Sequence, residues 1–392
     1  MRCICLSHET ALEFWRLWSA RNGIALHLFH CRKTMQTDDL PFRIFPSSAV
    51  LVDSSSAKRT VVEIIDGALE DGVPEELAEL LGACRVVLSE THSSKRSEES
   101  GIADSSSGAG KVLHVLGHRK PGVRTADGLT YHHSSATYPK GSFLKITRGV
   151  YVCVPELVFA QMASLLPFGA LLSLGYELCG CYPVEASEYL VRHPLCSPNR
   201  LVAFCSHLRG FKGSAAAKTA ARYVLAKSAS PAETSLAIIA TAPRNYGGFG
   251  MRGARLNEPV KLRREAERIA HDSSLVCDVL WPERGVALEY DSSQFHGSSL
   301  RLSRDSRRRS ALAAQGLEIR SITASQLENV FEFQETILHA FRAAGCDFKR
   351  LNGKQLDRHM RLRSELRKCV CGGGAKRAAE AKGRDARLNQ MH

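Results

Sequence analysis

The sequence lacks the patterns that mark membrane proteins and several large enzyme classes. None of its apolar runs approaches the roughly 18 residues that a transmembrane helix needs. It also has no Walker loop, no Gly-x-Gly-x-x-Gly turn after a strand and no Gly-x-Ser-x-Gly elbow, which are typical of nucleotide-binding proteins and serine hydrolases. We therefore predict a protein that has no membrane segment and no small-molecule cofactor.

Cysteine pairs with metal-binding spacing are also missing. The 13 cysteines are scattered, and the first residues carry charges instead of the apolar block of a secretory signal. These features predict reduced thiols in the cytoplasm. Cys179 and Cys181 have Cys196 nearby, but their spacing is C-x-C and there is no second well-spaced pair, so we do not expect zinc there. His132 and His133 lie in a strand-like run and are interpreted as structural.

What is present is an ordinary globular composition with an excess of basic residues. Hydrophobic residues make up 44% and charged residues 24% of the 392 residues, and this length favours two or three domains. The net charge is +13. Residues 349–392 hold 13 Lys/Arg and 4 Asp/Glu, whereas residues 228–348 hold 15 of each. The basic excess therefore lies mostly in a tail, which predicts either a solvated segment or loose binding to phosphates.

Shifts in composition divide the chain into five predicted parts. These are a small α/β region at 1–90, a Ser- and Gly-rich flexible linker at 91–111, a middle α/β region at 112–227, an α/β domain at 228–345 and a basic tail at 346–392. In the first part, ALEFWRLW and PEELAELLGA are typical of helices, and AVLVD and RVVLSE of strands. In the middle part, KVLHVLGH, GLTYHHSS and FLKITRGVYVCV alternate like strands, and helical runs follow.

The most informative element order lies in residues 228–345. Ser230-Pro-Ala-Glu233 is typical of a helix start, with Ser230 as the N-cap and Glu233 closing a capping box. The elements that follow are a strand near NEPVKL, strands at LVCDVLW and VALEYD, a helix over 302–315 ended by Gly316, a strand at LEIRSI, and a final helix opened by a second box at Ser325 and Glu328. The predicted order is helix, three strands, helix, strand and helix.

Three carboxylates lie in or beside strands that we expect to be at least half buried. Asp278 lies in LVCDVLW, and alternation along VALEYD places Glu289 and Asp291 on one face. Because an unpaired carboxylate is costly to bury, a divalent cation, an arginine or a proton should compensate. Hard cations such as Mg²⁺ prefer carboxylate oxygens, so a metal site is one interpretation. The alternative is that these acids simply mark strand ends in solvent.

The ordered set of motifs resembles the PD-(D/E)XK nuclease superfamily, and especially its Vsr-like group, the endonucleases of very-short-patch repair and their bacterial relatives. The matching pieces are Glu233 in SPAET, Asp278-Val-Leu-Trp-Pro282, Glu289-Tyr-Asp291 with His296, Arg304-Asp305-Ser-Arg-Arg308, and LEIRSIT. The resemblance covers about residues 228–345. It implies a restriction-endonuclease-like αβββαβ core, in which helices flank a central mixed sheet. It also implies Mg²⁺ or Mn²⁺ held by Asp278, Glu289 and Asp291, and hydrolysis of DNA phosphodiester bonds.

One position departs from the superfamily pattern, which ends in Lys where this sequence has Asp291. The same substitution is usual in the Vsr-like relatives, but it leaves the water-activating group open. His296 is a candidate general base, because an unperturbed imidazole titrates near neutrality. The alternative is a loop histidine in solvent. Glu233 is either a helix cap or a contributor to the site through a water, and the two roles are compatible.

Arginines are concentrated on the helix after the acidic strands. The candidates for binding nucleic acid are Arg301, Arg304, Arg308 and Arg309. Arg304 and Arg308 are one helical turn apart and share a face, where they can bind phosphates. An ordinary solvated helix face is the competing interpretation.

In layout, the chain also resembles proteins that join a region like the AbiE-type antitoxin regulators to a C-terminal Vsr-like domain. The match consists of HETALEFWR at the start and GVYVCVPELVFAQMA further on. We therefore predict a Mg²⁺-dependent endodeoxyribonuclease and keep, as an alternative, a DNA-binding regulator with a catalytically degenerate nuclease fold. A protein-interaction module of a defence system is a third interpretation. The oligomeric state and the DNA recognised stay open.

Overall fold

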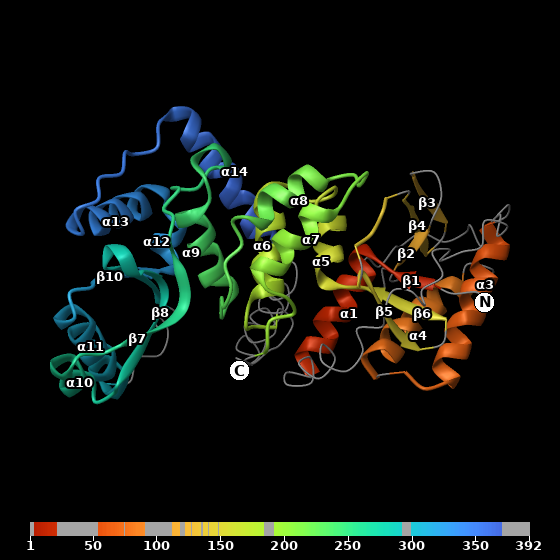
Figure 1. The fold of residues 1–392 in the computed structure, drawn as a ribbon, viewed down its shortest axis with the longest axis horizontal. Helices are drawn as coiled ribbons and strands as arrows, with labels where there is room; N and C mark the ends of the chain where they lie inside the picture. The colour runs from red at the N-terminus through yellow and green to blue at the C-terminus, as the bar shows by residue number, and fades with distance from the viewer. Residues whose placement is uncertain are drawn as a thin grey trace, which may run out of the picture. The chain divides into compact units, whose positions relative to one another are not determined.

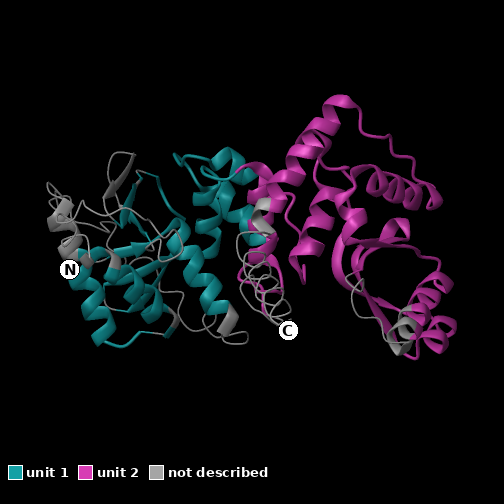
Figure 2. Ribbon diagram, turned by 180° about the vertical axis from the view of Figure 1, so that it is seen from behind, with its two compact units in different colours: residues 1–166, 199–218 teal, residues 167–198, 219–392 magenta. Residues whose placement is uncertain are grey.

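The computed structural model has a mixed α/β fold. It describes residues 4–21, 54–73, 75–90, 112–117, 122–126, 128–134, 136–139, 141–147, 149–183, 192–291 and 299–370. The chain divides into two compact units, shown in Figure 2: unit 1 comprises residues 1–166 and 199–218, and unit 2 comprises residues 167–198 and 219–392. Among the described helices, none combines the length and the apolar character that crossing a bilayer requires.

Unit 1 is built around a six-stranded mixed sheet (Figure 1). Its strands are β1 (Ile4–Leu6), β2 (Leu113–Gly117), β3 (Gly122–Ala126), β4 (Leu129–His133), β5 (Phe143–Thr147) and β6 (Val150–Cys153). They lie in the order β3-β4-β2-β1-β6-β5. The short β1 runs parallel to β6 and antiparallel to β2, and its three residues are fully buried. This apolar strand therefore joins the two halves of the sheet.

The first helix of unit 1 packs against the helix that follows the last strand of the sheet. The helices that lie wholly or mainly in this unit are α1 (His8–Arg21), α3 (Ser54–Glu70), α4 (Glu75–Glu90), α5 (Pro155–Met162), α7 (Pro198–His207) and α8 (Ser214–Ala221). Helix α1 contacts α4 and α5, and the indole of Trp15 donates to the carbonyl of Cys153 at 2.8 Å. The described parts of residues 1–90 and 112–166 thus share one core, in contrast to the predicted division between them. The predicted linker, 91–111, lies outside the described residues.

The predicted elements of unit 1 agree with the structure in most places. ALEFWRLW lies in α1, and residues 75–83 of PEELAELLGA lie in α4. The strands predicted in the middle part correspond to β2, β4, β5 and β6, whereas β1, β3, α3 and α7 were not expected. The strand predicted at RVVLSE is wrong, because these residues continue α4. Leu77, Leu81, Cys84 and Leu88 are buried at helical spacing, and this stripe outweighs the strand preference of the two valines. The strand predicted at AVLVD lies outside the described residues.

Unit 2 contains a four-stranded sheet in the order β10-β9-β8-β7. Its strands are β7 (Arg255–Lys261), β8 (Ser274–Trp281), β9 (Val286–Asp291) and β10 (Glu318–Thr323). Its helices are α6 (Phe168–Cys179), α9 (Pro231–Thr241), α10 (Arg264–Ala270), α11 (Ser299–Ala314), α12 (Ala324–Glu328), α13 (Val330–Ala343) and α14 (Gly353–Val370). From α9 to α13 the elements follow the predicted order, with α10 as an unpredicted addition between β7 and β8. Gly316 follows α11 with a φ of 84°, as expected for a C-cap.

Both faces of this sheet are covered by helices. On one face, Leu280 and Ala287 belong to an apolar cluster that includes Ala311 and Leu312 of α11. On the other, the ring of Trp281 meets the edge of Phe341 in α13, with centroids 5.0 Å apart. Strands β7, β8 and β9 pair antiparallel, and β10 runs parallel to β9 with Thr323 opposite Asp291. The sheet therefore lies between two packed layers of helices.

The last predicted helix consists of two helices. The capping box expected at Ser325 and Glu328 is wrong, because the structure has it two residues earlier, between Thr323 and Gln326. Helix α12 then stops after one turn. The side chain of Asn329 accepts the first free amides of α13 and starts a new helix.

The first part of the predicted basic tail belongs to the core of unit 2. Helix α14 contacts α6 and α9, and it buries His359, Leu362 and Leu366, which share one helix face. Nδ1 of His359 lies 2.7 Å from the carbonyl oxygen of Gly247. As far as Val370, the segment predicted to be a basic tail, either solvated or loosely bound to phosphates, is therefore helical and packed within unit 2. Residues 371–392 lie outside the described residues.

Candidate functional site

The acidic residues of unit 2 gather where strands β8 and β9 separate. The two strands pair in register from Trp281 opposite Val286 to Val279 opposite Leu288. Beyond this point, Oδ2 of Asp278 accepts the backbone N–H of Tyr290 at 2.8 Å. A side-chain carboxylate thus takes the place of a backbone acceptor, and the neighbouring strand fixes its position.

The environment of Asp278 disfavours its charged form. Burial is the largest cause, the charges of Glu233 and Glu289 add to it, and together they raise the pKa of Asp278 to about 7. The N–H of Tyr290 and the guanidinium of Arg308 act in the opposite direction but are outweighed. Glu233, Asp278 and Glu289 therefore form one interacting group, which we call the carboxylate cluster. Its negative charge is only partly compensated by the protein.

Glu289 is compensated by an arginine. Its Oε1 lies 2.5 Å from Nη2 of Arg308 in α11, and the same nitrogen also donates to the carbonyl of Val276. The side chains of Glu289 and Arg308 are 15% and 28% exposed, so this ion pair is largely shielded from water. Two of the three expected compensations are thus present: an arginine at Glu289, and a raised pKa at Asp278 that favours protonation.

Glu233 has a structural role and also belongs to the carboxylate cluster. The hydroxyl of Ser230 accepts the Glu233 amide at 3.1 Å, so the predicted N-cap is confirmed. The Glu233 side chain, however, accepts the amide of Ala229, one residue before the cap, at 2.9 Å. Its Oε2 also accepts from the side-chain amide of Asn257 at 2.8 Å. Both oxygens already have donors, because Oε1 accepts from the Ser230 hydroxyl at 3.1 Å.

Sequence reasoning missed Asn257, which links β7 to Glu233 and also donates to the carbonyl of Lys227 at 2.8 Å. Its φ of 47° lies in the left-handed region, which Asn tolerates better than most residues. An Asn within an otherwise strand-like run was the available signal. The side chain of Asn257 thereby connects β7 to the start of α9 and to the chain just before it.

The other predicted site residues lie at the end of β9, on α11 or outside the described residues. Asp291 is the last residue of β9 and lies opposite Thr323. His296 lies outside the described residues, as do the side chains of Arg301 and Arg304. Arg309 is exposed on α11.

The acids in the described part of unit 2 do not bring three ligand atoms within 4.8 Å of one another. Among the described residues, the group of three ligand atoms that all lie within 4.8 Å of one another is in unit 1 and consists of Glu9, His114 and His132. The predicted set of Asp278, Glu289 and Asp291 does not meet that distance. A cation in the carboxylate cluster would thus have to draw its ligands closer together.

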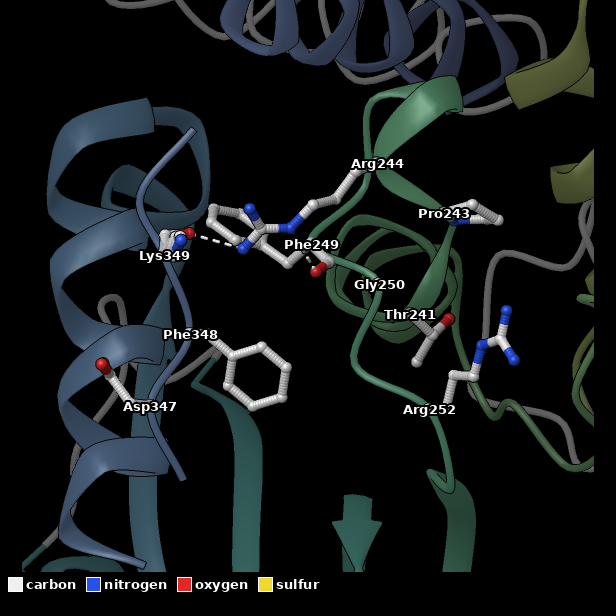
Figure 3. A pocket seen from close by; sticks show the side chains of 9 residues that line it. All are labelled: Thr241, Pro243, Arg244, Phe249, Gly250, Arg252, Asp347, Phe348 and Lys349. Atoms are coloured by element: carbon white, nitrogen blue, oxygen red, sulfur yellow. Dashed lines mark hydrogen bonds between the residues drawn. The ribbon is translucent and has the colours of Figure 1, made fainter. Parts of the chain in front are cut away.

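Unit 2 also contains a basic pocket with a volume of about 350 Å³. Figure 3 shows Asp347 and Lys349 on one wall and Arg252 on the opposite wall, with Arg244 above. Nη2 of Arg244 donates to the carbonyl of Lys349 at 2.5 Å, which ties the turn after α9 to the segment before α14. Three cations and a single carboxylate suit an anion better than a metal ion.

Comparisons with family models, with curated proteins and with solved structures found no match. The features of unit 2 that bear on its function are the carboxylate cluster, the ion pair between Glu289 and Arg308, and the basic residues of the unit.

Proposed function

We propose that unit 2 is a metal-dependent endonuclease-like domain with a restriction-endonuclease-like core, which hydrolyses DNA phosphodiester bonds. The observation that carries this proposal is the carboxylate cluster itself. Asp278 and Glu289 come from adjacent strands, Glu233 comes from the preceding helix, and their mutual repulsion helps to raise the pKa of Asp278 to about 7. Protein folding alone gains nothing from such repulsion, so a functional role is the simpler explanation.

The donor set of the site fits a hard divalent cation. Asp278 and Glu289 offer carboxylate oxygens, with Asp291 as the proposed third ligand, and Mg²⁺ or Mn²⁺ prefers such oxygens. Burial and the charges of Glu233 and Glu289 disfavour the ionised form of Asp278, and a bound cation would stabilise that form. When bound, the ion would make a water more acidic and neutralise charge on a phosphoryl oxygen.

The residues of the chain itself have separable roles in this proposal. The N–H of Tyr290 orients Asp278, and Arg308 orients Glu289. Arg308 is therefore assigned to the site and not to the DNA backbone, which revises its predicted role. Arg309 is exposed on the same helix and stays a candidate for binding phosphates, as do Arg301 and Arg304.

Nicking of supercoiled plasmid DNA tests this proposal. The wild-type protein should nick DNA with Mg²⁺ or Mn²⁺ and not with EDTA, and Asp278→Asn should lower the rate by at least about 100-fold, because it removes a ligand charge. Glu283→Gln is the matched control, since Glu283 is an exposed carboxylate at the turn between β8 and β9. Undiminished nicking by Asp278→Asn would assign the activity elsewhere or to a contaminant.

A DNA-binding regulator with a degenerate nuclease fold is the second candidate, and one observation favours it. The ion pair with Arg308 occupies an oxygen of Glu289 that a metal would need. In that case, calorimetric titration with Mg²⁺ should give the same heat for the wild type and Asp278→Asn. DNA binding should still weaken steeply with salt, and no hydrolysis should appear at high protein concentration.

A further inference from the structure

Two histidines and a glutamate from separate elements meet in unit 1. His114 lies on β2 and His132 on the neighbouring parallel strand β4, in a register that places both on the same face of the sheet. Glu9 is in the first turn of α1. Nδ1 of His114 lies 2.8 Å from Nε2 of His132 and 3.0 Å from Oε2 of Glu9.

The surrounding residues hold these three side chains in place. The backbone N–H of His114 donates to the hydroxyl of Thr10 at 2.8 Å. The ring of His132 stacks on the ring of His8, with centroids 3.5 Å apart and an angle of 19° between the planes. His8 is itself buried, with Nδ1 3.0 Å from the hydroxyl of Ser7. Such support around a ligand set fixes ring orientation and reduces the cost of binding an ion.

We propose that Glu9, His114 and His132 bind a Zn²⁺ ion whose fourth position is open to solvent. Two imidazole nitrogens and one carboxylate oxygen are a donor set that suits Zn²⁺, whereas Mg²⁺ prefers oxygen alone. The side chain of Glu9 is 48% exposed, so an ion can reach the site from water. This site is independent of the carboxylate cluster of unit 2.

The distances between the ligand atoms are close to those of a tetrahedral zinc site. Zn–N bonds of about 2.0–2.1 Å in a tetrahedron place the ligand atoms roughly 3.3 Å apart. The separations of 2.8 and 3.0 Å would therefore have to widen by a few tenths of an ångström.

Metal titration of the full-length protein tests the proposal, with Zn²⁺ in calorimetry and Co²⁺ as a spectroscopic probe. The cysteines of the chain can also bind these ions, but thiolate–Co²⁺ bonds give a strong charge-transfer band that His and Glu ligands do not. We expect one tetrahedral Co²⁺ per chain, identified by its visible spectrum, without the thiolate band. His114→Ala or His132→Ala should weaken Zn²⁺ binding by at least about 100-fold, and Glu9→Gln by about 10- to 100-fold.

Two controls separate ligand loss from damage to the fold. His207→Ala changes an exposed histidine in the same unit and should bind Zn²⁺ like the wild type. Glu9→Gln alters a half-exposed side chain, so its circular dichroism without metal should be unchanged. Equal affinity in the wild type and in Glu9→Gln, His114→Ala and His132→Ala would overturn the site, as would a spectrum dominated by thiolate. Asp278→Asn should leave Zn²⁺ binding intact, so this result is distinct from the nuclease test.

Discussion

Neutralising Asp278 should make unit 2 more stable, and the size of the effect follows from its pKa. The folded protein raises that pKa to about 7 from an ordinary value of 3.8. At 1.36 kcal/mol per pH unit, the difference corresponds to a cost of about 4 kcal/mol when the group is fully ionised. Asp278→Asn removes the charge, and the Asn oxygen can still accept the N–H of Tyr290.

The sign of the pH dependence is fixed by which state binds the proton more tightly. Because the folded state has the higher pKa, wild-type stability falls as pH rises from about 4 to about 7, and the full penalty applies above that range. Asp278→Asn should therefore exceed the wild type by up to about 4 kcal/mol at pH 8, and by only about 1 kcal/mol at pH 4.5. If the protein relaxes around the charged carboxylate, the stability differences at pH 8 and at pH 4.5 would both be smaller.

Urea unfolding at the two pH values measures this difference. Trp15 and Trp18 lie in unit 1 and Trp281 is buried in unit 2, so a background with Trp15→Phe and Trp18→Phe makes the fluorescence specific to unit 2. Glu283→Gln, which neutralises an exposed carboxylate, should change little at either pH. The reasoning fails if Asp278→Asn is no more stable than the wild type at pH 8, or if its advantage is the same at both pH values.

Two further substitutions test the packing of unit 2 by the same unfolding assay. Arg308→Met leaves Glu289 shielded and unpaired, so we expect a loss of about 3 kcal/mol at pH 8; the exposed neighbour variant Arg309→Met should be near neutral, and equal effects would contradict the assigned ion pair. Gly248→Ala would place its new Cβ 2.0 Å from a backbone oxygen, so we expect a loss above about 2 kcal/mol. Gly353→Ala meets no atom within 4 Å and should be tolerated, and similar stabilities for the two variants would refute the clash.

Elements with strong local chemistry could be predicted from the sequence. The cap at Ser230 and the stop at Gly316 depend on residues within one turn, so their patterns are visible without the fold. Strand β1 is different, because three residues are too few to show a period. It exists because its backbone pairs with strands that lie more than 100 residues away in the sequence.

Only part of the carboxylate cluster could be predicted, because some of its contacts join residues that are distant in the sequence. Alternation along β9 put Glu289 on a definite face, and Asp278 was recognised as an acid within an apolar strand. The contact of Asn257 with Glu233 required a left-handed residue within β7, which period-two reasoning does not anticipate. The meeting of Glu9, His114 and His132 was also hidden, since each residue is unremarkable in its own segment.

The two candidate functions of unit 2 differ chiefly in what Arg308 does. Arg308 lowers the pKa of Asp278 and pairs with Glu289, so it supplies part of the positive charge that a cation would supply. In a nuclease the arginine and the cation compete for Glu289, and removal of Arg308 should tighten Mg²⁺ binding even as it destabilises the fold. In a degenerate fold the arginine replaces the cation permanently, and its removal should leave a cluster that gains protons and no metal. The opposite responses of one variant thus separate catalysis from regulation more directly than the presence of the acids does.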